Sequence, residues 1–569
     1  MAFILQSEAH LPKMNGLHIN GQDSLVQPLL MDLYQLNMCY GYWRAGTFDD
    51  DACFDLFFRK NPFKGEFTVF VGLEDCLRLV QNFHFSASDM DFIREVLPNA
   101  EPEFYEFLEN LTCKKLKIFA IPEGTVVFPN MPLITLEGPL ALCQLLETVL
   151  LNLVNYSSLV ATNAARFRQV SGERVELLEF GLRRAQGPNG GLSASKYCYV
   201  GGFDSTSNLL AGKLFGIPVK GTQAHSFISS FSAESDLHAR TLTAKDGARS
   251  VDLVELSQRK LRTLMDQIEW GISQAELSVG ELVAFCAYAI AFREYSKIID
   301  NFNRFTLATG FLALIDTYDV LRSGVINFCA VTLAMHDLGY RAVGCRIDSG
   351  DLSYLSKEIR SRFKKIAALD YRNLSWIENL TIVASNDINE ETIVSLNDQQ
   401  HEINAFGVGT HLVTCQKQPA LGCVYKGLPK IKISQDVVKI TIPGRKRCYR
   451  LYGKAGFAIL DLMTLDDEPA PAVNTEILCR HPFEESKRAK VIPAKVEQLQ
   501  LEFWDGQEIR QTLPSLREMR SRVHQSIGDL RSDHKRIVNP TPYKVSVSER
   551  LYHFLHTIWL QNAPIGQLE

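Results

Sequence analysis

Residues 175–188 read Val-Glu-Leu-Leu-Glu-Phe-Gly-Leu-Arg-Arg-Ala-Gln-Gly-Pro, an apolar segment that ends in an aromatic ring, a glycine and two arginines. Val175–Phe180 has the composition of a buried strand, and Gly181 is typical of a turn at a strand end. Arg183 and Arg184 carry planar donors that fork onto a carboxylate or phosphate and stack on rings. The stretch therefore indicates a strand whose end binds a small flat anion, although paired arginines also form ordinary surface salt bridges.

The same pattern of an apolar run, a polar loop and a helix recurs along the chain up to about residue 425. Further candidate strands cover residues 199–203, 217–222, 341–347, 381–385 and 403–406. Helices are expected after several of them, because Asp387–Glu390 has the capping-box spacing and Ser349 precedes an amphipathic segment. Alternating strands and helices predict an α/β fold with parallel strands, in which ligands bind at the carboxyl ends of the strands.

The chain of 569 residues is too long for one compact core. Residues 142–167 place apolar side chains three and four positions apart, which predicts one long helix. Beyond residue 430 the pattern changes to antiparallel strands, expected at 437–442, 448–452 and 457–462, followed by helices with capping boxes at Ser515 and Ser546. We expect four parts: a flexible leader (1–24), an N-terminal α+β segment (25–165), an α/β catalytic domain (166–430) and a C-terminal segment (431–569) that packs with the N-terminal one.

Composition narrows the class of protein. The 60 basic and 65 acidic residues give a net charge of −5 without a basic block, which argues against nucleic acid as a partner. The 13 cysteines form no Cys-x-x-Cys pair, a usage typical of reduced thiols in the cytosol. The longest apolar run, 282–292, is too short to span a bilayer. We therefore expect a cytosolic protein with no membrane partner.

Two polar loops follow expected strands. His225, among the small residues of 221–226, is placed to act as a base or a phosphate acceptor, or else to be an ordinary hydrogen-bonded loop histidine. Asp348 and Asp351 flank a Ser-Gly turn after Arg346. Carboxylates there suit water-bound Mg²⁺ or ribose hydroxyls, with simple helix capping as the alternative.

Small residues follow two other candidate strands. Gly407 and Gly409 let backbone N–H groups approach phosphate oxygens, and Thr410 adds a hydroxyl, although a tight turn would use the same residues. Asp204 lies in a similar strand-to-helix segment and would equally serve as a helix cap. Together these loops predict a pocket for a flat anion and a phosphorylated sugar.

Seven of these segments, in order along the chain, resemble the nicotinate phosphoribosyltransferase family, in its long animal form. They are Leu29–Gln35, Phe57–Arg59, Glu179–Pro188, Gly201–Ser205, Gly221–Phe227, Arg346–Asp351 and Phe406–Thr410. The resemblance implies the type II phosphoribosyltransferase fold, an irregular α/β barrel with a flanking α+β domain built from the N- and C-terminal segments. It also implies a homodimer that shares its active sites.

The activity implied by the resemblance joins nicotinate to 5-phosphoribosyl 1-diphosphate, giving nicotinate mononucleotide and diphosphate, the first step of NAD synthesis from nicotinate. ATP hydrolysis would be coupled through transient phosphorylation of His225, with Mg²⁺ or Mn²⁺ as cofactor. Asp348 would share the catalytic role, and Mg²⁺ would lie near Asp348 and Asp351, bound through water without direct side-chain ligation.

The resemblance also assigns binding residues. Nicotinate contacts are expected from Tyr34, Phe180, Arg183, Thr222 and Arg346. For phosphoribosyl diphosphate the resemblance implies a contact from Thr410, and the residue pattern adds Gly407, Gly409 and Asp204 as expected contacts. Tyr34 would complete the site of the partner subunit.

Residues 293–310 are expected to be an insertion relative to the family, which would reshape the pocket if it follows a strand. Two alternatives stay open, the second of them suggested by this insertion. One is a phosphoribosyltransferase for nicotinamide or quinolinate, and the other is a catalytically silent isoform that binds nucleotide metabolites.

Overall fold

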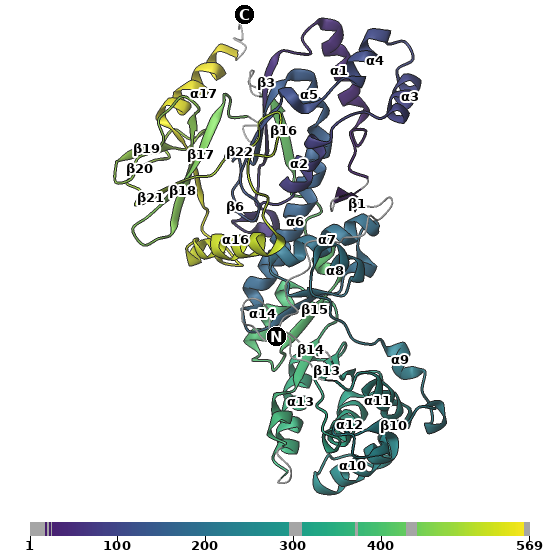
Figure 1. The fold of residues 1–569 in the computed structure, drawn as a ribbon. Coiled ribbons are helices and arrows are strands. Elements are labelled where there is room, and N and C mark those ends of the chain that lie inside the picture. Colours follow the sequence, from purple (N-terminus) through teal and green to yellow (C-terminus); the bar gives the residue numbers. More distant parts are fainter. Residues whose placement is uncertain are drawn as a thin grey trace, which may run out of the picture. The chain divides into compact units, whose positions relative to one another are not determined.

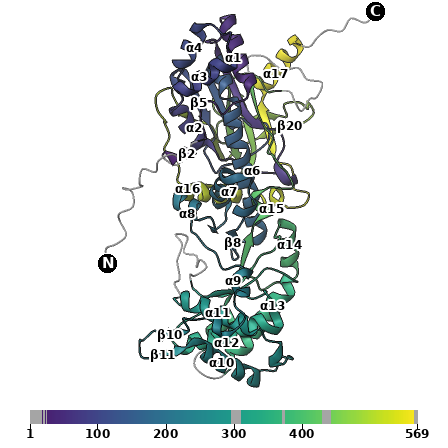
Figure 2. The ribbon, with the colours of Figure 1, turned by 90° about the vertical axis from the view of Figure 1, so that its right-hand side faces the viewer.

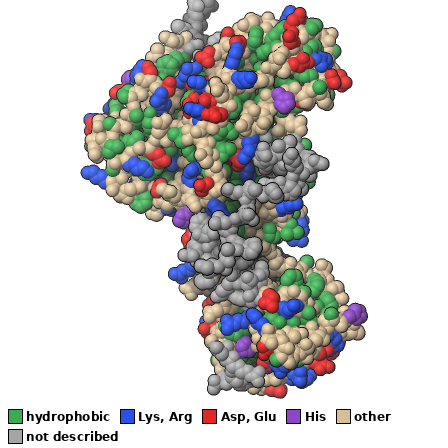
Figure 3. Space-filling model, in the orientation of Figure 1, with side chains coloured by type: hydrophobic (Ala, Val, Ile, Leu, Met, Phe, Trp, Pro, Cys, Tyr) green, Lys and Arg blue, Asp and Glu red, His purple; other side chains and the backbone are tan. Residues whose placement is uncertain are grey.

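The computed structural model describes residues 18–19, 22–23, 25–294, 310–369, 374–427 and 441–562, and the chain divides into two compact units (Figure 1). The terminal unit comprises residues 1–163 and 417–569, and the central unit comprises residues 164–416. Most of the expected leader and of the expected insertion lies outside the described residues. Acidic and basic side chains are interspersed on the visible surface of each unit (Figure 3).

The terminal unit contains a five-stranded antiparallel sheet to which both ends of the chain contribute. Its strands, in spatial order, are β16 (Cys423–Gly427), β3 (Asp51–Phe58), β7 (Ile134–Pro139), β5 (Lys117–Ala120) and β22 (Leu501–Trp504). Strands from beyond residue 416 therefore form both edges of a sheet whose centre comes from the first third of the chain. The flanking α+β domain built from both terminal segments is confirmed, and it includes residues 417–427, which the sequence placed with the catalytic domain.

A second, six-stranded sheet belongs to the C-terminal segment. In order it comprises β20 (Arg488–Val491), β19 (Ile477–Arg480), β23 (Lys544–Ser548), β18 (Ala458–Leu465), β17 (Lys446–Tyr452) and β21 (Lys495–Gln498). Two of the three expected strands pair as β17 and β18; of the third, 437–440 lies outside the described residues and 441–442 is not a strand. Arg450 and Asp461 form a buried ion pair across this hairpin, 2.8 Å apart.

Helices surround these two sheets. They are α1 (Leu33–Ala45), α2 (Leu73–Gln81), α3 (Ala87–Val96), α4 (Pro102–Glu109), α5 (Leu140–Leu145), α16 (Leu516–Gly528) and α17 (Glu549–Asn562). The capping box at Ser515 is confirmed. The cap of α17 is Ser548 and not Ser546, because Leu551 donates to the Ser548 hydroxyl and Ser546 lies inside β23. The expected long helix is present as α6 (Glu147–Ser171), preceded by α5.

The central unit is built on a six-stranded parallel sheet. Its order is β12 (Leu312–Leu314), β13 (Gly344–Ile347), β14 (Thr381–Ala384), β15 (Ala405–Val408), β8 (Glu176–Glu179) and β9 (Ser205–Thr206). Its helices are α7 (Gly187–Gly201), α8 (Leu209–Phe215), α10 (Leu253–Gln267), α11 (Val279–Ala291), α12 (Val325–Asp337), α13 (Leu352–Ala367) and α14 (Glu390–Asp398). Helices α10, α11 and α12 pack against one another (Figure 2). The predicted α/β class is confirmed.

Some sequence-based assignments in this unit were wrong. Residues 199–203 were expected to form a strand but include the end of α7, because a short buried apolar run does not distinguish a strand from a buried helix. The expected strand at 217–222 is reduced to a single parallel bridge between Val219 and Thr206. Helix α13 is capped by Asp351 and helix α14 by Asn389, each two residues beyond the expected cap.

All thirteen cysteines are unpaired, and twelve of them are fully buried. Burial raises the pKa of Cys39, Cys143 and Cys345 to about 12. Because only the thiolate reacts readily, the native protein should release less than about one equivalent of thionitrobenzoate from Ellman's reagent at pH 8 within minutes. Unfolding in guanidinium should expose all thirteen.

The Cys423→Ser variant is the control for that measurement, because Cys423 alone among the thirteen is only partly buried. It should abolish any slow native reaction. Rapid release of several equivalents from the folded protein would contradict this account of the thiols.

A buried carboxyl group gives the central unit a pH-dependent stability. Glu281 is inaccessible to solvent, and burial raises its pKa from 4.5 to about 7 despite hydrogen bonds from Ser323 and Asn327. The unfolded chain loses this proton near pH 4.5, and the folded chain holds it until about pH 7. Stability is therefore lost as the pH rises through this window, and the full cost is present above pH 7.

Glu281→Gln keeps the shape of the protonated carboxyl group and removes this titration. It should stabilise the protein at pH 8.5 by on the order of 3 kcal/mol and at pH 5 by less than about 1 kcal/mol. Urea unfolding midpoints at the two pH values measure the difference. An equal gain at both would show that Glu281 does not hold its proton in the folded state.

No helix in the described ranges is long and apolar enough to cross a membrane.

Candidate active site

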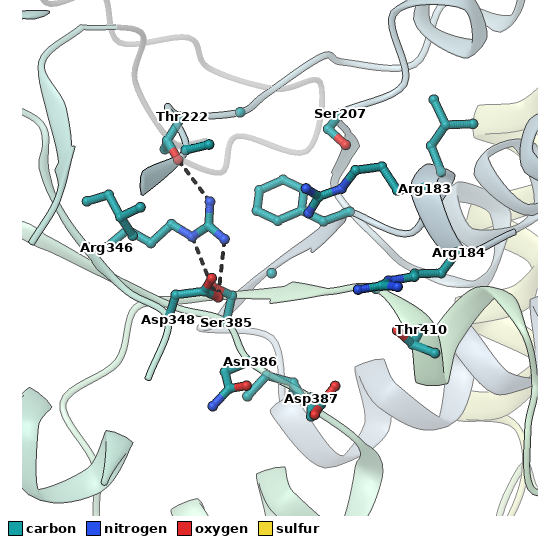
Figure 4. A pocket seen from close by; sticks show the side chains of 18 of the residues that line it. Arg183, Arg184, Ser207, Thr222, Arg346, Asp348, Ser385, Asn386, Asp387 and Thr410 are labelled. Atoms are coloured by element: carbon teal, nitrogen blue, oxygen red, sulfur yellow. Dashed lines mark hydrogen bonds and ion pairs between the residues drawn. The ribbon is translucent and has the colours of Figure 1, made fainter. Parts of the chain in front are cut away.

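A cavity of about 510 Å³ opens at the carboxyl ends of the parallel strands, entirely within the central unit. The predicted residues that line it are Phe180, Arg183, Thr222, His225, Arg346, Asp348, Gly407, Gly409 and Thr410. Figure 4 shows Arg183 and Arg184 extending into this cavity from one side and Arg346 from the other. Nine predicted residues from four separate segments of the chain thus converge on one cavity.

Three other predicted residues do not line this cavity. The buried carboxylate of Asp204 pairs with Arg168 and accepts a 2.9 Å hydrogen bond from the Leu177 amide, so it holds the start of β8 in place. Asp351 accepts from the Tyr354 amide as the cap of α13. Tyr34 lies on α1 of the terminal unit, where 44% of its surface is exposed.

Arg346 is held at the end of β13 by three hydrogen bonds. Its Nε donates to Ser385 Oγ at 2.9 Å, its Nη1 to Thr222 Oγ1 at 3.1 Å, and its Nη2 to Asp348 Oδ1 at 3.3 Å (Figure 4). The guanidinium carbon also lies 5.4 Å from the centroid of the Phe180 ring. Since arginine has five N–H donors, this arrangement fixes the group in place and leaves two donors for a ligand.

The position of the Phe180 ring depends on a glycine. A Cβ atom at Gly407 would lie 2.6 Å from the ring, which is closer than any real contact. In the same way a Cβ atom at Gly181 would lie 2.3 Å from Val413. Both glycines therefore allow a side chain to approach the backbone closely. For Gly407 this role differs from the phosphate contact expected from the sequence, but the two roles are compatible.

His225 lies at the start of the short helix α9 (His225–Ser229) with its side chain about half exposed. Its Nδ1 is hydrogen-bonded to Thr317 Oγ1 at 3.1 Å. Its Nε2 lies 3.9 Å from Asp316 Oδ1 and 3.8 Å from Asp348 Oδ2. One ring nitrogen is thus positioned by a hydroxyl, and the other faces two carboxylates.

Sequence reasoning missed Asp316. This buried residue follows β12, and its Oδ2 accepts from the Asp348 amide at 2.8 Å and from Ser349 Oγ at 2.6 Å. Its Oδ1 has no hydrogen-bond partner among the described residues. The apolar run before Asp316 has the pattern of the other strands and could have identified this residue. Residues 311–318 were treated only as the segment that follows the expected insertion.

The loop after β14 was also missed. The Ser385 hydroxyl donates to Asp348 Oδ1 and its backbone amide donates to the Ile347 carbonyl at 3.0 Å, so this residue links two neighbouring strands. Asn386 and Asp387 line the cavity with φ angles of 102° and 45°, a region that non-glycine residues rarely occupy. Such strain is concentrated at ligand sites, and Asp387 had been interpreted only as part of a helix cap.

The charges that line the cavity favour an anion. Three arginines, Arg183, Arg184 and Arg346, face it, against the carboxylates of Asp348 and Asp387. Asp348 is already engaged by Arg346 and Ser385. A phosphorylated or carboxylated ligand would therefore meet a positive local field although the chain as a whole is negative.

Among the described residues, no group of three or more His, Cys, Asp or Glu side chains is placed to hold a metal ion. Mg²⁺ however often binds through one or two carboxylates, waters and substrate phosphates. Asp348 facing the cavity and the unpartnered Oδ1 of Asp316 suit that mode.

The fold and the cavity define an α/β protein with an arginine-lined cavity at the carboxyl ends of its parallel strands. Family models match three parts of the chain: the nicotinate phosphoribosyltransferase N-terminal domain at residues 29–155, the nicotinate phosphoribosyltransferase family at 328–441 and the C-terminal domain at 445–555. The chain is 64% identical over 580 residues to nicotinate phosphoribosyltransferase of Caenorhabditis elegans, covering all of both chains. It is 43% identical to that of Homo sapiens, covering 95% of this chain and 98% of the human one.

The crystal structure of human nicotinic acid phosphoribosyltransferase superposes with a TM-score of 0.81 at 42% identity and covers 93% of this chain and all of the human chain. The nicotinate-nucleotide pyrophosphorylase structure from Pyrococcus furiosus shares the fold, with a TM-score of 0.54 at 19% identity. This chain belongs to the nicotinate phosphoribosyltransferase family.

Proposed function

We propose that the protein catalyses the reaction for which its relatives are named and is a nicotinate phosphoribosyltransferase. It joins nicotinate to 5-phosphoribosyl 1-diphosphate, giving nicotinate mononucleotide and diphosphate. The observation that carries the proposal is the pair of Arg346 and Phe180, a fixed guanidinium beside an aromatic ring in a positively charged cavity. Family membership supports it.

The geometry favours nicotinate over nicotinamide. The two N–H groups that Arg346 has free match a carboxylate, and a neutral amide offers them only one acceptor oxygen. Arg183 adds a second positive charge at the opposite side of the cavity. The flat pyridine ring suits the Phe180 face.

In the proposed reaction the pyridine nitrogen attacks C1 of the ribose, and the bond between C1 and the diphosphate oxygen breaks with its electron pair leaving on diphosphate. The sugar passes through a cation-like state. The protein contributes by holding the ring in line, with Phe180 and Arg346, and by stabilising the departing negative charge. Mg²⁺ or Mn²⁺ would neutralise part of the diphosphate charge beside Asp348 and Asp316.

We further propose that ATP hydrolysis is coupled to the reaction through His225, which makes the enzyme ligase-like. With the Nδ1 proton donated to Thr317, the lone pair of Nε2 is available to attack the γ-phosphorus of ATP, forming an N–P bond as ADP leaves. Two carboxylates lie within 3.9 Å of Nε2, so the divalent cation would also be needed to bring a phosphate there. The reaction would be the first step of NAD synthesis from nicotinate.

The proposed assembly is a homodimer in the cytosol, where reduced thiols persist. The exposed Leu33, Tyr34 and Met38 give α1 an apolar surface suited to a second subunit. In that dimer Tyr34 would complete the neighbouring site.

The decisive experiment incubates the purified chain with nicotinate, phosphoribosyl diphosphate, ATP and Mg²⁺ and measures the mononucleotide by mass. Nicotinate should be consumed at micromolar concentrations while nicotinamide and quinolinate are ignored. Preference for either competitor would replace the proposed substrate. Binding without turnover, with activity gained on deletion of residues 293–310, would identify a silent isoform.

A further inference from the structure

Arg184 is a cavity residue to which the proposed reaction gives no role, although the sequence marks it, with Arg183, as a donor for an anion. It ends the 3-10 helix η3 (Leu182–Arg184) and is exposed, and its side chain lines the cavity. Among the described residues it has no ion-pair partner, whereas Arg346 is engaged by Thr222, Asp348 and Ser385. An arginine that faces a binding cavity without a carboxylate is available to a ligand anion.

The backbone holds Arg184 firmly in this place. Its amide donates to the Gly181 carbonyl at 2.8 Å, and Gly181 packs so closely on Val413 that a Cβ atom there would collide with it. Val413 belongs to helix α15 (Thr410–Val413), which contacts η3. Arg184 and Thr410 therefore face the cavity from elements that are packed together, as Figure 4 shows for their side chains.

The cavity thus has two chemically different ends. Over β12 and β13 lie His225 and Asp348, and the Oδ1 of Asp316, which does not itself line the cavity, is 3.9 Å from His225 Nε2. Over β15 and β8 lie Thr410 and the two arginines of η3, and the second carboxylate that lines the cavity, Asp387, follows the neighbouring strand β14. Carboxylates favour a phosphate group that carries a divalent cation, and unpaired guanidinium groups favour a phosphate that carries none.

We infer that Arg184, together with the Thr410 hydroxyl, binds the 5′-phosphate of the sugar substrate. This inference rests on the proposed function. Phosphoribosyl diphosphate has two anionic groups on different sides of its ribose, and the cation accompanies the diphosphate. The metal-free 5′-phosphate matches the arginine end, and it stays there through the reaction because the mononucleotide product retains it. Arg184 is thereby a specificity residue for phosphorylated sugars.

Ribose 5-phosphate is the probe that isolates this contact, because it carries the 5′-phosphate without the diphosphate. Arg184→Gln should weaken its binding, measured by calorimetry, by about 10- to 100-fold, the loss expected for charge-assisted hydrogen bonds. The KM for phosphoribosyl diphosphate should rise to a similar degree, with product inhibition by inorganic diphosphate unchanged. Arg184→Lys should recover part of the affinity, since it keeps the charge but not the planar fork.

Arg259→Gln is the matched control, because Arg259 is an exposed arginine on α10 outside the cavity and its loss changes the net charge equally. It should bind ribose 5-phosphate like the wild type. The inference is overturned if Arg184→Gln binds ribose 5-phosphate normally, if it weakens diphosphate inhibition instead, or if the wild type does not bind millimolar ribose 5-phosphate. Since binding needs no turnover, an enzyme that fails to use nicotinate would refute the proposed function and leave this test intact.

Discussion

Arg346→Ala should lower kcat/KM for nicotinate by roughly 10²- to 10⁴-fold, which corresponds to two charge-assisted hydrogen bonds to the substrate carboxylate at about 1.5–3 kcal/mol each. The loss should fall on nicotinate much more than on phosphoribosyl diphosphate, since the guanidinium lies beside the Phe180 ring. Steady-state kinetics with each substrate varied in turn measures the difference.

Arg346→Lys is the informative comparison. Lysine keeps the charge, but one ammonium group cannot bond Ser385, Thr222 and Asp348 and also present a fork to the ligand. It should therefore recover only a small part of the activity. Thermal unfolding of both variants is the control, and loss of folding in proportion to activity would remove Arg346 from the binding site.

The second large effect concerns His225. Incubation of the protein with γ-labelled ATP and Mg²⁺ should give an acid-labile phosphoryl group, and His225→Ala should abolish it. The effect is expected to be complete because the proposed step makes Nε2 of His225 the nucleophile, and alanine has no atom that could replace it. Acid lability distinguishes phosphohistidine from phosphoserine or phosphothreonine.

Two other histidines serve as controls for this labelling. His238 is exposed and does not line the cavity, so His238→Ala should be labelled normally. His411 does line it. Label that persists in His225→Ala and disappears in His411→Ala would transfer the role to His411, and label that persists in both would exclude a cavity histidine.

The features that the sequence predicted well are those with a local cause. Strand β8 and the residues after it follow from an apolar run that ends in Phe180, Gly181 and Arg183, and the rule that strand ends meet explains why Thr222, Arg346 and Thr410 share a cavity. Such patterns depend on neighbours in the chain, so no knowledge of distant packing is needed.

The features that it missed depend on distant contacts. Asp204 has the local pattern of a site residue, but its carboxylate is taken by Arg168, 36 residues away in the chain. Asp316 accepts hydrogen bonds from the Asp348 amide and the Ser349 hydroxyl, in the loop that follows β13. The glycine at 407 was explained by phosphate binding, whereas the contact that requires it comes from Phe180.

The five-stranded sheet of the terminal unit has a consequence for biosynthesis. On the ribosome, β3, β5 and β7 emerge long before β16 and β22, so the β3 edge of this sheet stays unpaired until residue 427 has been made and the β5 edge until residue 504. The intervening residues 164–416 carry their own core and are free to collapse first. A chain truncated before β22 would therefore combine a folded central unit with a terminal unit whose sheet has an unpaired edge. An exposed edge of this kind is the sort of surface that chaperones bind.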